Sequence, residues 1–87
     1  MTLEQEKEFS TKDLWLASAL SHLLNTQPTY KVENGQTIFI FPKSDSLYRA
    51  IGAYNSGIEI NAYEYAQIVK RLRAEMLMRR GRGSRND

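Results

Sequence analysis

Few side chains in this 87-residue sequence are spaced for catalysis. Ser10 and Asp13 could pair a nucleophile with an acid, but their three-residue spacing is typical of a helix N-cap, which we favour. His22 is the only histidine, and a half-exposed or core-edge position is favoured over the role of a catalytic base. The carboxylates of residues 1–8 precede every predicted element, whereas a general acid needs a fixed position.

Metal and cofactor chemistry have no pattern in the sequence either. The absence of cysteine excludes disulfides and thiolate metal sites, and a single histidine cannot form a histidine cluster. The five glycines make neither a GxGxxG motif nor a phosphate loop. The sequence therefore predicts a protein that is not an enzyme and has no cofactor, metal or small-molecule substrate.

Basic residues are concentrated near the C-terminal end. The formal net charge is only +2, yet seven of the 12 lysines and arginines fall within residues 70–85, where Glu75 is the one carboxylate. The negative end of a helix dipole accounts for one or two such cations. We therefore predict an accessory protein that binds nucleic acid through its phosphates, largely independently of sequence because no base-reading motif is present. The predicted contacts are Lys70, Arg71, Arg73, Arg79, Arg80, Arg82 and Arg85.

A β-hairpin is the clearest local prediction. Asn34-Gly35 separates residues 30–33 from residues 36–41, and both turn residues tolerate the positive φ of a type I′ turn. This turn fixes the pairing of the two strands and places four apolar residues on one face, which we take as the core face: Tyr30, Val32, Phe39 and Phe41.

The opposite hairpin face carries Ile38 and Ile40, and neither side chain favours water. A homodimer joined through the hairpin is therefore the alternative to nucleic-acid binding, with these two residues in the interface. A basic helix on a membrane surface is a weaker alternative, because its apolar stripe is needed by the core.

Helices are predicted on both sides of the hairpin. The first begins at Ser10, the second is capped by Ser44 or Asp45, and the third follows Asn61, whose spacing to Glu64 is that of a capping box. The apolar stripe of the third helix ends near residues 76–78, and its members are Tyr65, Ile68, Val69, Leu72 and Met76.

Aromatic residues on these helices leave two interpretations open. Trp15 is placed in the core in preference to acting as a platform for a nucleobase. A dense set of tyrosines suits either the core edge or a binding surface: Tyr48, Tyr54, Tyr63 and Tyr65.

Together these elements predict one α+β domain of the order helix, β-hairpin, helix, helix, with a two-stranded antiparallel ribbon packed on the helices. The predicted boundaries are a flexible acidic N-terminus at 1–8, the domain at 9–78 and a disordered basic Arg/Gly-rich tail at 79–87. No apolar run is long enough to span a membrane, and the acidic start is unlike a signal peptide. We therefore expect a cytoplasmic location.

Three segments carry a resemblance: EFSTKDLWLA at residues 8–17, NG with IFIF at 34–35 and 38–41, and INAYEYA at 60–66. They resemble a family of short uncharacterised single-domain proteins of bacteria and their phages, a domain of unknown function. The resemblance covers about residues 8–78. It implies a single domain and adds no catalytic residue, because these motifs are caps, a turn and apolar positions.

Overall fold

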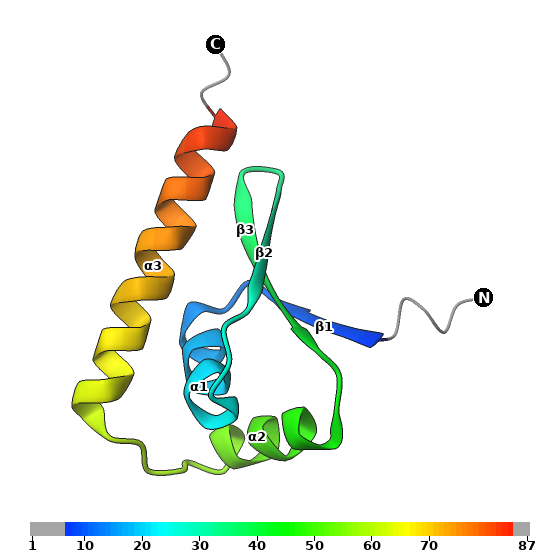
Figure 1. The fold of residues 1–87 in the computed structure, drawn as a ribbon, viewed down its shortest axis with the longest axis vertical. Helices are drawn as coiled ribbons and strands as arrows, with labels where there is room; N and C mark the ends of the chain where they lie inside the picture. Colours follow the sequence, from blue (N-terminus) through cyan, green and yellow to red (C-terminus); the bar gives the residue numbers. More distant parts are fainter. Residues whose placement is uncertain (1–6, 85–87) are drawn as a thin grey trace.

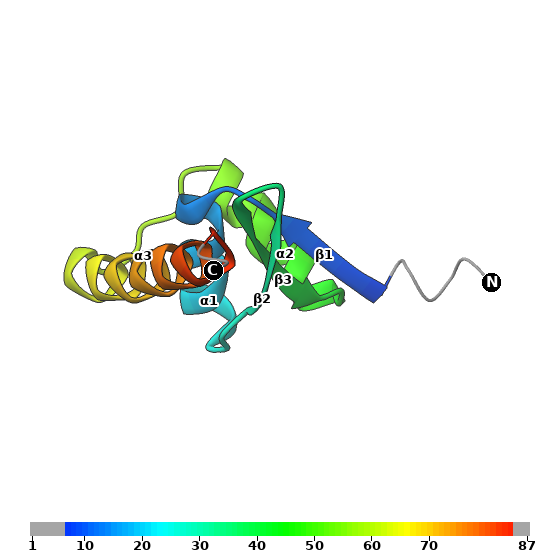
Figure 2. The same ribbon diagram turned by 90° about the horizontal axis from the view of Figure 1, so that it is seen from above.

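The fold, seen in a computed structural model that describes residues 7–84, combines helices with a three-stranded antiparallel sheet (Figure 1). The α+β class predicted from the sequence is confirmed. The chain runs β1 (Glu8–Thr11), α1 (Leu14–Leu24), β2 (Thr29–Glu33), β3 (Gln36–Pro42), α2 (Asp45–Asn55) and α3 (Ala62–Ser84). Figures 1 and 2 show α3 and β1 at opposite sides of the molecule, with α1 between them.

The hairpin β2–β3 forms in the predicted register. Asn34 and Gly35 take φ values of 52° and 75°, as a type I′ turn requires, and Tyr30 pairs with Phe39. Phe39 is fully buried, and so is Phe41 two residues further on the same face. The core face is therefore confirmed for these two residues and for Tyr30, which packs against the core. The prediction for Val32 is wrong, because Val32 near the end of β2 is 36% exposed.

The two-stranded ribbon predicted from the sequence is wrong, because β1 adds a third strand. It pairs antiparallel with β3, Phe9 lying opposite Phe41, and the strand order is β1-β3-β2. Phe9 packs against the core from this strand. The ordered domain therefore includes Glu8, which the sequence had placed in a flexible terminus, while residues 1–6 lie outside the described part.

The predicted cap of the first helix is also corrected. Ser10 lies in β1, and α1 is capped by Asp13, whose Oδ1 accepts hydrogen bonds from the backbone N–H groups of Trp15 (2.9 Å) and Leu16 (3.2 Å). An aspartate with two N–H groups in reach is a strong N-cap. Residues 8–11 are thus free to extend along β3.

Helix α1 is the centre of the domain. It contacts α2, α3 and β1, and the small side chains of Ala17 and Ala19 are fully buried, which lets its neighbours approach closely. Trp15, in its first turn, is 55% exposed. The prediction that Trp15 belongs to the core is therefore wrong.

The caps of the other two helices are as predicted. Ser44 Oγ accepts a 3.0 Å hydrogen bond from Leu47 N–H at the start of α2. Asn61 Oδ1 accepts one of 2.9 Å from Glu64 N–H at the start of α3. Within residues 7–84, no helix has both the length and the apolar character needed to cross a membrane.

Candidate nucleic-acid interface

Helix α3 has a buried face and a basic face. On the buried face Leu72 is fully enclosed, and Ile68 and Met76 pack against the same core. The other side carries three exposed cations: Lys70, Arg71 and Arg73. The helix has 23 residues, so it is roughly 35 Å long at 1.5 Å per residue. Its long outer face is the candidate site.

Lys70, Arg71 and Arg73 are all exposed, with Lys70 at the middle of this outer face and the two arginines toward its edges. Among residues 7–80, whose side chains the structure describes, the ion pairs are Lys31–Glu33 and Arg79–Glu75. None of the three outer cations therefore has a carboxylate partner there. We call Lys70, Arg71 and Arg73 the outer basic set.

Arg79 has a different environment. Its Nε donates a 3.0 Å hydrogen bond to Glu75 Oε1, and its guanidinium lies 4.3 Å from the centroid of the Tyr30 ring. The sequence placed the end of helix packing before this residue. Instead α3 continues through it to Ser84, because the half-buried arginine covers the hairpin as an apolar side chain would. Arg79 thus links α3 to β2.

The remaining predicted contacts are less defined. Arg80 is half-buried in α3 and makes a further interaction of its own. Arg82 and Arg85 lie outside the residues whose side chains are described. The disordered tail predicted to begin at residue 79 is corrected as far as Ser84, where the helix ends.

The outer basic set spans two flanks of α3. At about 100° per residue, Arg71 and Arg73 point roughly 160° apart, with Lys70 between them. Arg71 lies on the flank that borders the end of α1, and Arg73 lies on the opposite flank. The site is therefore a broad convex surface and not a narrow stripe.

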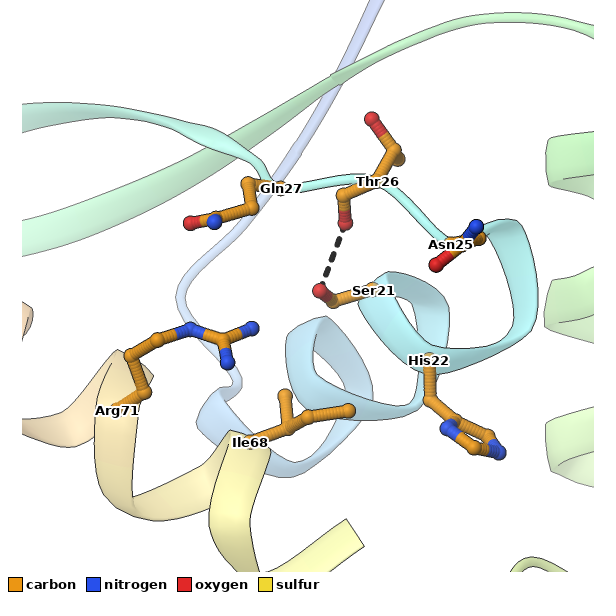
Figure 3. Close-up of a pocket in the computed structure, with 7 residues that line it drawn as sticks. All are labelled: Ser21, His22, Asn25, Thr26, Gln27, Ile68 and Arg71. Carbon is orange, nitrogen blue, oxygen red and sulfur yellow. Dashed lines mark hydrogen bonds between the residues drawn. The ribbon is translucent and has the colours of Figure 1, made fainter. Parts of the chain in front are cut away.

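Arg71 borders a cleft of about 340 Å³ at the end of α1 (Figure 3). Its guanidinium points into the cleft, while Ser21 Oγ on the opposite wall donates a 2.7 Å hydrogen bond to the Thr26 carbonyl. The imidazole of His22 projects from the rim on the other side of the helix turn. Ser21 and His22 therefore do not form a nucleophile–base pair.

A second cleft, of about 640 Å³, lies between the end of α2 and the start of α3. Its lining is largely apolar and aromatic: Tyr54, Asn55, Gly57, Ile58, Ile60, Ala62 and Tyr65. Tyr65 also packs against Trp15, with ring centroids 6.3 Å apart. Its hydroxyl donates a 2.9 Å hydrogen bond to the Trp15 carbonyl.

Two tyrosines have raised pKa values, and burial is the main cause for both. For Tyr30 the nearby Glu75 raises the pKa further, while Arg79 and Arg71 oppose the shift. For Tyr65, burial is followed by smaller effects from Tyr54 and Asp13. The Tyr30 hydroxyl is buried without a hydrogen-bond partner in the described structure.

The predicted dimer residues lie on the sheet face opposite the helices. Ile38 and Ile40 are each half-buried there. Lys31 is paired with Ile38 in the strand register and forms a 3.0 Å ion pair with Glu33 on the same face. Ile38 and Ile40 therefore share the sheet face on which the sequence placed them.

Sequence reasoning missed the exposure of Trp15. The chain's single tryptophan is held by Tyr65 while more than half of its surface faces solvent. Leu14 and Leu16 on either side of it pack against the core, and helical periodicity turns Trp15 about 100° away from each of them. Within the described residues, no group of three His, Cys, Asp or Glu side chains could hold a metal.

Comparison with known proteins gives no match to a family model, a curated protein or a solved structure. The resemblance to short uncharacterised proteins stays a prediction.

Proposed function

We propose that this protein binds nucleic acid through the phosphate backbone, without reading sequence and without catalysing a reaction. The observation that carries the proposal is the outer basic set. Lys70, Arg71 and Arg73 are exposed on one helix and unpaired with any described carboxylate.

The helix dipole does not account for these cations. All three lie more than two turns before Ser84, where α3 ends, and the dipole acts on the last turn. Glu75, the one carboxylate from residue 65 to residue 80, is engaged by Arg79. The potential outside this part of α3 is therefore positive, which attracts a polyanion.

A convex helix face suits phosphate contacts in particular. Each cation that neutralises a duplex phosphate adds about −0.9 to the slope of log K against log salt, so three contacts predict a slope near −2.7. The sequence contains no recognised base-reading motif. Binding is therefore expected to depend on salt far more than on sequence.

The experiment compares two triple variants of equal charge. Lys70→Ala/Arg71→Ala/Arg73→Ala removes the outer basic set, and alanine preserves helix propensity. The control removes three exposed cations elsewhere and consists of Lys12→Ala, Lys43→Ala and Arg49→Ala. Binding to a fluorescent 20-nucleotide strand and to its duplex is measured by anisotropy at several salt concentrations.

The proposal predicts that the parent and the control variant bind with a clear salt slope, and that the outer-set variant loses most of it. If the two triple variants bind equally, binding depends on the net charge of the protein and not on the position of the outer basic set. Absence of parent binding to both probes at 50 mM salt would reject the function.

Homodimerisation through the hairpin is the second candidate, and one observation favours it. The Glu33–Gln36 pair closes the two-residue turn and is a hydrogen-bonded pair, and hydrogen-bonded and non-hydrogen-bonded pairs alternate along an antiparallel ladder. The backbone N–H and C=O groups of Tyr30 and Val32 therefore point away from β3, toward the open edge of the sheet. If β2 of a second copy pairs with this edge in the antiparallel direction, with the two Val32 residues opposite each other, Lys31 of each copy lies opposite Glu33 of the other. The exposed edge is thus complementary to itself in charge.

Charge reversal tests this dimer. Lys31→Glu alone is expected to give a monomer by light scattering, and Lys31→Glu/Glu33→Lys to restore the dimer with its pairs inverted. A parent mass of about 10 kDa at high micromolar concentration would contradict dimerisation.

A further inference from the structure

We propose that the preferred ligand is a single strand, whose bases stack on Trp15 and enter the neighbouring apolar cleft while its phosphates lie along α3. This inference rests on the proposed function and specifies its ligand class. It draws on three observations: an exposed indole packed against Tyr65, an aromatic cleft lined by the same tyrosine, and cations further along α3.

Trp15 is exposed yet held in place. Its backbone N–H donates to the capping Asp13 carboxylate, and its ring packs against Tyr65 with an interplanar angle of 39°. More than half of its surface remains open. Single exposed apolar residues are common, but a fixed, open indole presents a face on which any base can stack.

The 640 Å³ cleft begins where this aromatic pair ends. Tyr65 packs on Trp15 and also lines the cleft with Ile58, Ile60 and Tyr54. Tyr65 therefore connects the indole to the cleft.

Arg73 is the cation of the outer basic set that lies nearest around the helix to Tyr65. From Tyr65, Val69 and Arg73 follow at four-residue spacing, and Arg73 lies about 80° around and roughly 12 Å along the helix axis. Lys70 lies next to Arg73 on the outer face. A strand with a base on Trp15 would thus reach Arg73 with phosphates about two nucleotides away.

A duplex cannot use this surface in the same way. Its bases are stacked on each other inside the helix, and only phosphates and groove edges are offered to Trp15 and the cleft. Stacking and cations combined are typical of proteins that bind single strands without sequence preference. The pair of features therefore favours a single strand over a duplex.

The parent protein supplies the most direct readout, because Trp15 is the only tryptophan. Three probes are titrated at 50 mM salt: oligo-dT of 20 nucleotides, a 20-base-pair duplex, and a 20-unit abasic strand with the same phosphates and no bases. Oligo-dT is expected to quench Trp15 emission and to bind most tightly. The duplex and the abasic strand are expected to bind through salt-dependent contacts without quenching.

The variants separate stacking from charge. Trp15→Ala is expected to weaken oligo-dT binding by about 5-fold or more and to leave duplex binding unchanged. Trp15→Phe keeps a ring and most of the affinity, and Tyr48→Ala, which removes an exposed ring from α2, is the matched control. The Tyr65 hydrogen bond survives each Trp15 variant because its acceptor is a backbone carbonyl.

The outcomes distinguish this inference from the proposed function. Unquenched Trp15 at saturation, or duplex binding as tight as oligo-dT binding, would overturn the single-strand inference and leave phosphate binding in place. Equal oligo-dT affinity of the parent and a folded Trp15→Ala variant would do the same. Absence of binding to all three probes would overturn both.

Discussion

The buried and outer faces of α3 carry arginines in opposite surroundings. On the buried face Arg79 is held by Glu75 and lies over the Tyr30 ring. On the outer face Arg73 is exposed, with no ion pair to any described carboxylate. A guanidinium with a satisfied environment stabilises the fold, whereas one left open provides charge for a partner. Charge density in the sequence does not distinguish these two roles, but packing does.

The apolar residues of α3 should show the largest contrast. Leu72 is fully buried and Leu77 is 49% exposed. Leu72→Ala is expected to lower the free energy of unfolding by about 2–5 kcal/mol, because it leaves a cavity in the core. Leu77→Ala on the same helix is the control and should change it by less than about 1 kcal/mol. Urea denaturation followed by circular dichroism measures both. Similar losses in the two variants would mean that the buried face is assigned to the wrong residues.

Removing the Arg79 side chain should have the next largest effect. Arg79→Ala gives up the contact with Tyr30 and the ion pair with Glu75. Both partly face solvent, with Arg79 and Glu75 side chains 41% and 34% exposed, so screening reduces the pair's value. We expect a loss of about 1–1.5 kcal/mol in unfolding free energy, and less for Arg79→Lys, which keeps the charge. Arg73→Ala is the control and should be near neutral; an equal loss there would contradict a special role for Arg79.

The start of α3 fixes which residues face inward, so its cap is a further test. Asn61→Ala removes the acceptor of the Glu64 N–H bond and should cost about 1 kcal/mol. Asn61→Asp keeps an acceptor and should be nearly neutral. If the denaturation midpoint of Asn61→Ala equals that of the parent, the capping contact has no role in stability.

The smallest effect should come from the Tyr30 hydroxyl. Burial raises its pKa above the ordinary value of 10.0, so the fold disfavours the phenolate. The stability that this hydroxyl contributes is fully present below pH 10 and is lost as the pH rises through the raised pKa. Tyr30→Phe should decline less steeply from pH 9 to pH 11 than the parent, and at pH 7 it should be neutral or stabilised by up to about 1 kcal/mol, because the hydroxyl has no partner. Parallel pH profiles for Tyr30→Phe and the parent would contradict this assignment.

Local signals in the sequence predicted much of the fold. The Asn34-Gly35 turn, the cap at Asn61 and the inward stripe through Leu72 are each determined by neighbours within a few residues, and all three were found as predicted. The strand at Glu8–Thr11 was missed, because it depends on the free edge of β3, a partner some thirty residues away. Ser10 also offered a competing local cap, and only tertiary pairing removes it.

The candidate site could be predicted in composition but not in arrangement. The density of cations from residue 70 onward is visible in the sequence. Which of them stay open depends on Glu75 and Tyr30, which come from the same helix and from a distant strand. Trp15 was assigned to the core by residue type, although it is exposed between Leu14 and Leu16, which pack against the core.

The salt dependence of nucleic-acid binding by Arg73→Ala and Arg79→Ala tests the division of α3 most directly. Both variants lose one positive charge from the same helix, and both are measured at low temperature with circular dichroism confirming the fold. The outer-face account predicts that the slope of log K against log salt becomes less steep by about 1 for Arg73→Ala and stays at the parent value for Arg79→Ala. Equal slopes for the two variants, or a change only in Arg79→Ala, would contradict it.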